Sequence, residues 1–218
     1  GLPVCERGAI ARFLAAGRFP VHFLDFEACQ TAVPFVPGTQ PYEVVVVQYS
    51  VHTLSSPCAE PEAHSFLCDW SAASPDPRPS LLAALERDLA GAGTIGVFNS
   101  GFESARLRDF AEAFPGALPW IREALGKLLD FWEPFKDFHW YHPGQEGKTG
   151  IKTLLPLVCG RKYDALAIAD GHQASLAWLE AHLRPGQDAR AKEQVRAALE
   201  RYCQLDTEAR VELYRFLM

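Results

Sequence analysis

The sequence lacks an apolar run near the 18 or so residues of a membrane-spanning helix, and it lacks a leader in which charged residues precede an apolar stretch. It also lacks a tight CxxC pair among its six cysteines. Scattered cysteines fit reduced thiols in an intracellular protein better than a disulfide framework. We therefore expect a cytoplasmic protein with no membrane segment.

An excess of positive charge is also missing. The formal net charge is −6, which counts against a protein that coats nucleic acid through a broad basic surface. It does not exclude an enzyme that holds nucleic acid in one groove. The composition, 48% hydrophobic and 22% charged over 218 residues, is typical of a globular chain that buries one large core. Because the chain begins at Gly1 rather than Met, we expect either a processed product or a domain cut from a longer protein with other domains.

Hydrophobic patterning predicts an α/β fold. Expected strands occupy residues 21–26, 43–54, 63–68 and 94–99, and expected helices occupy 6–17, 79–91 and 103–114, with a long last helix from residue 188. Strands first, and then strand and helix in alternation, predict a mixed sheet covered by helices. We expect a leading helical segment at 1–19 and one principal domain at 20–218.

The stretch "VHFLDFEACQ", residues 21–30, places two acids in an otherwise apolar strand. Asp25 and Glu27 are two residues apart, so their side chains lie on one face of the strand and repel each other. A nearby cation would offset that repulsion.

A third acid lies on the last helix. A stripe facing the core is predicted at Val195, Leu199, Tyr202, Asp206, Ala209, Leu213 and Phe216. An unpaired carboxylate there would be costly, so Asp206 needs a positive partner, yet no Lys or Arg is predicted on the stripe. Tyr202 lies one turn earlier, where its hydroxyl can share the same pocket.

Glu103 follows the strand at 94–99, in "VFNSGFESARL", near the carboxyl end of the strand where α/β sheets build their sites. Taken alone, Glu103 is more typical of an acid that stabilises a helix N-terminus. Together, the four acids predict hard oxygen ligands for Mg²⁺ or Mn²⁺. Two such ions about 4 Å apart can activate water and stabilise a leaving oxygen in phosphodiester hydrolysis.

Three motifs carry a family resemblance. "LDFE" resembles the D-x-E motif of the DEDD 3′-5′ exonuclease superfamily, "FNSGFE" its second motif, and "YCQLD" the Y-x-x-x-D motif of its tyrosine subclass. This superfamily has an RNase H-like fold, a mixed central sheet of about five strands flanked by helices. The stretch from "LDFEACQ" to "VVVVQYSVH" is also similar to an uncharacterised bacterial domain family, often found at the end of longer proteins with RecB-like nuclease features.

The resemblance implies roles for single residues. Asp25, Glu27 and Asp206 would be metal ligands, with Asp25 bridging two ions, and Tyr202 would orient the attacking water. Glu103 stands where the superfamily has Asp, and its extra methylene would either be accommodated or weaken binding of the second ion and lower activity. The histidine subclass is excluded because Arg201 is five residues before Asp206.

The same resemblance implies a substrate, the single-stranded 3′ end of DNA or RNA. Asn99, in the second motif, and Lys152 are expected to contact it. Lys152 lies in the segment 147–163, which also carries Lys148, Arg161 and Lys162 and no acid, a pattern equally typical of a solvated helix. "LLDFW" through "GIKTLLPLV" resembles the stretch between the second and third motifs, but it assigns no catalytic role to Asp130.

The sequence also allows other sites and functions. His139 and His142 could ligate a metal as a pair, and so could Cys58, His64 and Cys68, although the latter set lacks a fourth ligand. Aromatic residues could stack on bases or pack in the core; these are Trp132, Trp140 and Tyr141. A nuclease-like fold that binds nucleic acid or a partner domain without cutting, or a phosphoesterase for small nucleotides, would carry the same acids.

Overall fold

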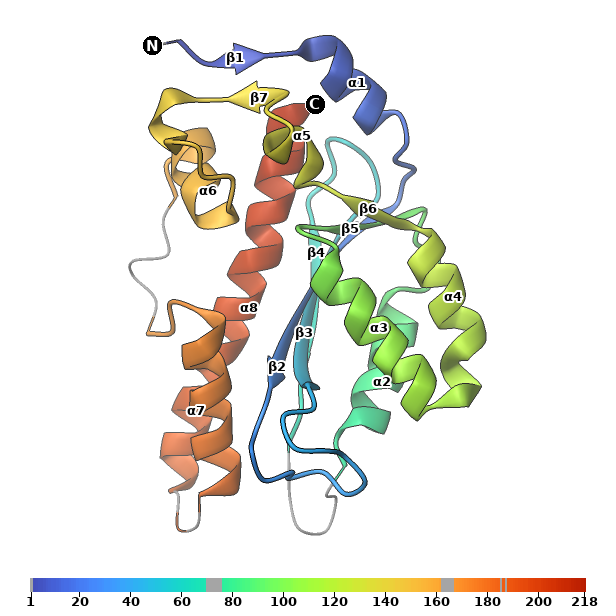
Figure 1. Cartoon of the computed structure of the whole chain (residues 1–218), viewed down its shortest axis with the longest axis vertical. Helices are drawn as coiled ribbons and strands as arrows, with labels where there is room; N and C mark the ends of the chain where they lie inside the picture. The colour runs from blue at the N-terminus through green and yellow to red at the C-terminus, as the bar shows by residue number, and fades with distance from the viewer. Residues whose placement is uncertain (1, 70–75, 162–166, 185, 187) are drawn as a thin grey trace.

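A five-stranded mixed sheet forms the centre of the computed structural model, which describes residues 2–69, 76–161, 167–184, 186 and 188–218 (Figure 1). The strands are β2 (Val21–Cys29), β3 (Val45–Leu54), β4 (Glu62–Leu67), β5 (Thr94–Val97) and β6 (Leu128–Asp130), in the order β4-β3-β2-β5-β6. β2 pairs antiparallel with β3 and parallel with β5. The expected fold class, a mixed α/β sheet of about five strands flanked by helices, is confirmed.

Helices cover both faces of the sheet. They are α1 (Arg7–Leu14), α2 (Arg78–Asp88), α3 (Gly101–Ala113), α4 (Leu118–Gly126), α5 (Glu133–Lys136), α6 (Ile151–Cys159), α7 (Gly171–Leu183) and α8 (Ala189–Leu217), with short 3-10 turns at Pro115–Ala117 and Pro143–Gln145. In Figure 1, α6, α7 and α8 lie on one side of the sheet and α2, α3 and α4 on the other. A central strand between two helical layers must be apolar on both faces, which explains the continuous burial of β2 from Val21 to Glu27.

Each predicted element lies within a few residues of an observed one, but three short strands, β6 and two of only two residues each, and the helices α4, α5 and α7 were not predicted individually. β1 (Val4–Cys5) pairs antiparallel with β7 (Trp140–Tyr141). Two-residue strands carry no measurable alternation of apolar and polar residues, so the sequence gives no sign of them. The segment 1–19 therefore contributes a strand as well as α1, and Ile10 of α1 packs with Phe135 and Trp140.

Buried polar contacts fix α8 against the sheet. Gln48 on β3 donates through Nε2 to the Leu199 carbonyl at 3.0 Å. Thr207 Oγ1 lies 2.8 Å from Ser50 Oγ and 2.7 Å from His52 Nδ1, both also on β3. Because unpaired polar groups are costly inside a protein, these contacts specify the rotation of α8 about its own axis. Among the described residues, no helix combines the length and apolar character needed to cross a bilayer.

Candidate metal centre

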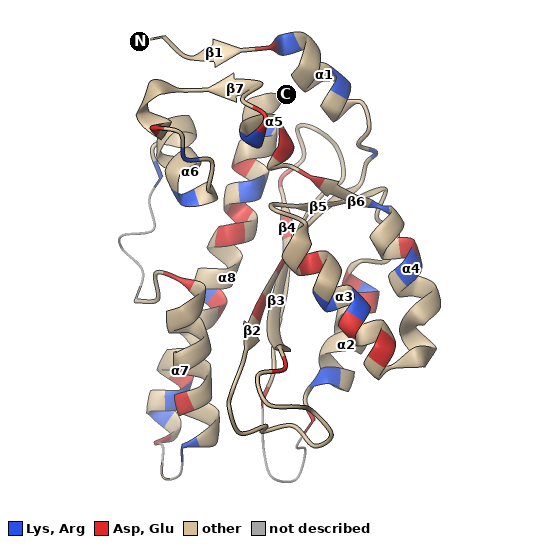
Figure 2. Cartoon of the chain, viewed as in Figure 1, with Lys and Arg blue, Asp and Glu red and all other residues tan. Residues whose placement is uncertain are grey.

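Carboxylates from three elements converge beside the middle of β2. Asp25 and Glu27 come from β2, Glu103 from the first turn of α3 and Asp206 from α8, and each is less than 10% exposed. Figure 2 shows acidic positions on neighbouring stretches of β2, α3 and α8. The register pairs Asp25 with Ser50 and Glu27 with Gln48, so both acids lie deep in the sheet.

Asp25 and Glu27 share their pocket with a thiol. One carboxylate oxygen of each acid and Cys203 Sγ all lie within 4.8 Å of one another. The Cys203 thiol donates weakly to Asp25 Oδ2 at 4.0 Å. The shared face of the two acids follows from strand alternation. Cys203 was not predicted, although its place three residues before Asp206 on α8 puts it on the same helical face.

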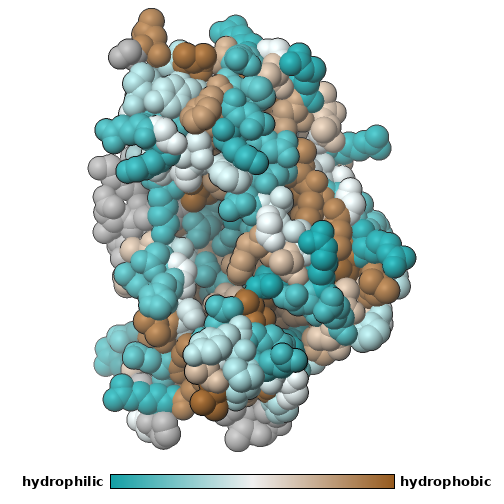
Figure 3. Space-filling view, viewed as in Figure 1, coloured by the Kyte–Doolittle hydropathy of each residue, from teal (hydrophilic) through white to brown (hydrophobic). Residues whose placement is uncertain are grey.

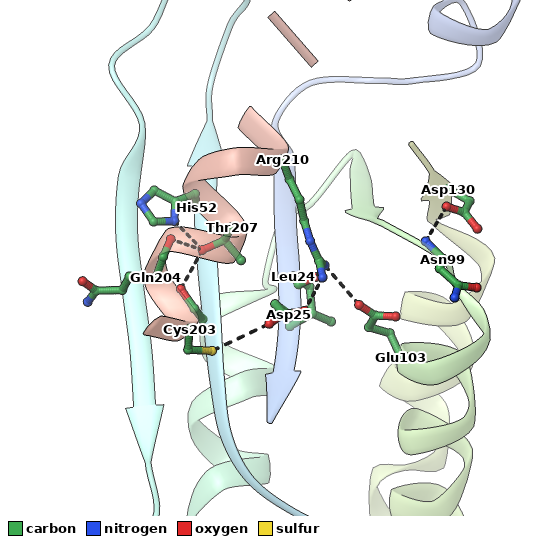
Figure 4. Close-up of polar contacts among 11 residues, drawn as sticks. Leu24, Asp25, His52, Asn99, Glu103, Asp130, Cys203, Gln204, Thr207 and Arg210 are labelled. Carbon is green, nitrogen blue, oxygen red and sulfur yellow. Dashed lines mark hydrogen bonds and ion pairs between the residues drawn. The ribbon is translucent and has the colours of Figure 1, made fainter. Parts of the chain in front are cut away.

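Arg210 corrects the sequence interpretation that no Lys or Arg lies on the Asp206 stripe. Its guanidinium donates through Nη1 to Glu103 Oε1 at 3.1 Å and to the Leu24 carbonyl, and through Nη2 to Asp25 Oδ1 (Figure 4). Arg210 is four residues after Asp206, one helical turn further along the same face. The predicted stripe included Ala209 and left out Arg210. The positive partner that the buried acids require is nevertheless present.

Burial raises the pKa of the carboxylates more than Arg210 lowers it. Desolvation, with repulsion from Asp206 and Glu103, raises the pKa of Asp25 to about 8, although the Arg210 charge opposes this. Desolvation and the Asp25 charge hold the pKa of Glu27 well above its usual range. Desolvation also raises the pKa of Glu103 against the opposing effect of Arg210. One guanidinium therefore does not compensate this group of acids, and more positive charge would stabilise their ionised forms.

Two buried polar atoms in the centre have no hydrogen-bond partner among the described residues, Glu103 Oε2 and Arg210 Nε. Glu103 is 2% exposed and Arg210 5% exposed. Buried polar atoms are almost always paired, so unpaired ones call for an explanation such as a ligand. Both atoms belong to side chains that surround Asp25.

Asp206, Tyr202 and Lys152 belong to the same neighbourhood. The Asp206 charge raises the pKa of both Asp25 and Glu27, which places it close to them. Tyr202 is buried, and its ring centroid lies 5.7 Å from Lys152 Nζ. The Lys152 charge lowers the pKa of Glu27, and its Nζ donates to the Ala169 carbonyl. The predicted Tyr202 and Lys152 sites therefore lie beside the acids.

Only part of the basic segment at residues 147–163 lies near this centre. Arg161 forms an ion pair with Glu208 on α8 at 2.7 Å, so its charge stabilises the contact between α6 and α8. Lys148 is exposed, and Lys162 lies outside the described residues.

Asn99 anchors the turn that precedes α3 instead of joining the acids. Its backbone has a positive φ of 66°, and its N–H donates to Asp130 Oδ1 at 2.9 Å. The Asp130 carboxylate also accepts N–H groups from Ser100 at 2.8 Å and Trp132 at 3.0 Å. Asp130 thereby ties β6 to the turn that positions Glu103. Figure 4 shows Asn99 and Asp130 on the far side of Glu103 from Asp25.

A groove of about 440 Å³ borders the acids. Its lining includes Ala28, Phe102 and Gly171, which neighbour the site, together with Tyr42 and Leu176. Gly171 approaches Glu27 so closely that a Cβ at this position would lie 3.3 Å from Glu27 Oε2. The space-filling view shows a recess with a mainly hydrophilic lining on the face between the α3 side and the α6–α7 side (Figure 3).

The alternative metal sites have structural contacts. His139 Nδ1 lies 3.0 Å from Glu6 Oε2, and His142 Nδ1 accepts the Gly144 N–H as a cap of the turn at Pro143–Gln145. Cys58 is exposed and Cys68 is buried. Over the described ranges, only one group of three or more His, Cys, Asp or Glu side chains lies close enough together to hold a metal ion. This group is Asp25, Glu27 and Cys203.

The alternative stacking surface is largely core. Trp140 is 5% exposed and packs edge-on against Phe135 and Phe216. Trp132 donates through Nε1 to Thr149 Oγ1 at 3.0 Å. These contacts support the interpretation of the aromatic residues as packing groups.

The donor set could hold a hard divalent ion. Asp25 and Glu27, with Asp206 beside them, offer carboxylate oxygens, the ligands that Mg²⁺ and Mn²⁺ prefer. The second predicted ion, between Asp25 and Glu103, does not fit as simply, because the Arg210 guanidinium contacts both of those carboxylates.

Comparison with known proteins gives one relationship. No curated protein and no solved structure matches the chain. Residues 22–150 match a family described as a domain of unknown function (DUF2779). This span contains Asp25, Glu27 and Glu103 and ends before α8. Because the match covers more than half of the 218 residues, the chain belongs to this family of domains of unknown function (DUF2779).

Proposed function

We propose that the protein is a metal-dependent nuclease that removes nucleotides from single-stranded 3′ ends. The observation that carries this proposal is the buried convergence of Asp25, Glu27 and Asp206 from β2 and α8, elements far apart in the sequence. Buried acids at such short range are stable together only with protons or cations among them. A bound Mg²⁺ or Mn²⁺ supplies Lewis acidity at a phosphate and lowers the pKa of a water molecule.

The chain's own residues have distinct roles in this proposal. Asp25, Glu27 and Asp206 hold the ion. Tyr202, buried beside them on α8, orients the attacking water through its hydroxyl. Lys152, close enough to Glu27 to lower its pKa, faces the non-bridging oxygens of the phosphate.

The groove next to the acids supports a polymer substrate over a free phosphate ester. Phe102, adjacent to Glu103, is 42% exposed, and Tyr42, which also lines the groove, is 67% exposed. Exposed aromatic rings beside a phosphate site are suited to stacking on unpaired bases. A single strand bound here would present its terminal phosphodiester to Asp25 and Glu27.

The test is degradation of 5′-labelled single-stranded DNA and RNA oligonucleotides with Mn²⁺ or Mg²⁺. We expect a ladder that shortens from the 3′ end, abolished by EDTA and by Asp206→Ala. Glu193→Gln changes an exposed acid on the same helix and should leave the ladder intact. Degradation that persists in EDTA or in Asp206→Ala would refute the proposal.

Arg210 favours one alternative, a nuclease-like domain that binds nucleic acid or a partner domain without cutting. Its guanidinium already neutralises part of the acidic centre. Binding of single-stranded oligonucleotides with Mn²⁺, without turnover of DNA, RNA or nucleotide esters, would establish this alternative. Activity on nucleotide esters alone would establish a small-molecule phosphoesterase. The cytoplasmic location and the link to further domains stay predictions.

A further inference from the structure

We propose that Arg210 is a built-in cation that takes the place of the second metal ion, so that the centre binds a single divalent ion. The proposal rests on the proposed metal-dependent function. In it, Asp25, Glu27 and Asp206 hold the ion, and the Arg210 guanidinium provides the second positive charge between Asp25 and Glu103.

The geometry of the guanidinium carries this inference. Both terminal nitrogens bind the two acids that a second ion would have to share, Asp25 through Nη2 and Glu103 through Nη1. Nη1 also binds the Leu24 carbonyl, so the side chain is fixed by backbone as well as by charge. A guanidinium keeps its proton in proteins. A divalent ion placed between the same two carboxylate oxygens would therefore be repelled by its positive charge.

Burial explains why Arg210 would not simply move away. The side chain is 6% exposed and its partners Asp25 and Glu103 are 11% and 3% exposed. Breaking a buried ion pair leaves uncompensated charges, which is strongly destabilising. A second ion would have to break both ion pairs of this buried guanidinium.

Glu103 is suited to this arrangement. It stands where the resembling motif has Asp, and its longer side chain reaches the guanidinium from the first turn of α3. Two buried atoms at the centre have no hydrogen-bond partner among the described residues. They are an acceptor, Glu103 Oε2, and a donor, Arg210 Nε.

The decisive measurement is the number of Mn²⁺ ions bound by the unmodified full chain, from calorimetry and from the loss of the free-ion signal in electron paramagnetic resonance. We expect one tight ion per chain. Two tight ions would overturn the role of Arg210 and leave the proposed function standing. No tight ion would overturn the metal-dependent function itself.

A variant series separates charge from folding. Arg210→Met should bind a second Mn²⁺, and its melting temperature should rise on Mn²⁺ addition more than that of the unmodified chain. Arg190→Met, an exposed site on the same helix, is the matched control and should bind one ion.

Should Arg210→Met fail to fold without metal, the double variant Arg210→Met/Glu103→Leu removes both members of the buried pair. It should fold and retain one ion on Asp25 and Glu27. Failure of Arg210→Met to gain an ion when folded, or two ions in the double variant, would contradict the inference.

Discussion

At the scale of single residues, Asp25 is affected by the charges of Arg210, Asp206 and Glu103. It accepts from Arg210, receives the weak Cys203 thiol contact, and lies on the same strand face as Glu27. Its raised pKa means that a proton competes with any cation for its oxygens. A substitution here therefore tests the ion site directly.

Asp25→Asn should lower the affinity for Mn²⁺ by at least about 100-fold, because it removes a ligand charge that an amide oxygen does not replace. Titration calorimetry at constant pH measures the loss. Glu193→Gln, which removes an exposed charge, should leave the affinity unchanged. An Asp25→Asn variant that binds Mn²⁺ as tightly as the unmodified chain would remove Asp25 from the ion site.

Cys203 should resist alkylation in the folded protein. It is fully buried, and desolvation with the charges of Asp25, Glu27 and Asp206 holds the pKa of its thiol well above the usual range. Because the thiolate is the nucleophile, iodoacetamide at pH 8 should modify the exposed Cys5, Cys58 and Cys159 and spare Cys203. Mass spectrometry of digests measures this, with urea-unfolded protein as the control in which Cys203 reacts. Equal rates for Cys203 and Cys159 in the native state would contradict it.

At the scale of elements, apolar patterning located the strands β2 to β5 and the helices α1, α2, α3 and α8, but it did not separate the helices between residues 118 and 183. The same patterning could not locate β1 and β7, each only two residues long. It placed Asp206 on the buried face of α8 but missed Cys203 and Arg210. The buried face of a helix includes residues beside a single i, i+3, i+4 series. Polar residues on that face are recognised only when their partners on β2 and α3 are known.

Asp130 should act as a structural anchor of the β5–α3 turn. Its carboxylate accepts three backbone N–H groups, and hydrogen bonds to a charged acceptor contribute about 1.5–3 kcal/mol each without being additive. Asp130→Ala should therefore lower the free energy of unfolding by about 2–3 kcal/mol. Urea denaturation measures this, and the exposed Asp137→Ala is the control. A change below about 0.5 kcal/mol, the range of ordinary surface substitutions, would exclude the anchor role.

Gly96 on β5 permits two aromatic rings to pack against the strand. A Cβ there would lie 2.7 Å from Phe131 Cε2 and 2.9 Å from Phe23 Cδ1. Gly96→Ala should therefore destabilise the fold by about 1–3 kcal/mol through overpacking. Gly126→Ala, where a Cβ meets no atom within 4 Å, should be neutral or stabilising in the same denaturation experiment. Equal effects of the two substitutions would mean that the rings move aside at no cost.

At the scale of the whole molecule, the fold brings acids from β2, α3 and α8 into one buried place in a chain whose net charge is already −6. The sequence predicted that these acids meet, from the apolar strand around Asp25 and Glu27, the core-facing stripe around Asp206 and the place of Glu103 at the carboxyl end of a strand. It could not predict how their charge is balanced, since that depends on side-chain geometry across three elements. Without an ion, the folded protein must compensate through Arg210 and through protons.

This balance predicts that the metal-free protein loses stability as the pH rises from 7 to 8.5. The pKa of Asp25 is raised to about 8, so in this window the folded state holds a proton on Asp25 that the unfolded chain has released. The free energy of unfolding then falls with pH, by about 1 kcal/mol for Asp25 alone. Burial lowers the pKa of His22 and His52, which acts in the opposite direction, but mainly below pH 7, where unfolded histidines titrate.

Urea denaturation at pH 7.0, 7.75 and 8.5, with and without saturating Mn²⁺, measures both effects. Mn²⁺ binds the deprotonated carboxylates of the folded state only, so it should stabilise the protein more at pH 8.5 than at pH 7.0 and cancel most of the decline. Asp25→Asn should show a smaller decline without metal, because it no longer exchanges a proton at this position. A free energy of unfolding that is constant or rises from pH 7 to 8.5 in the metal-free protein would mean that Arg210 alone keeps the acids ionised. The acids would then not need a divalent ion.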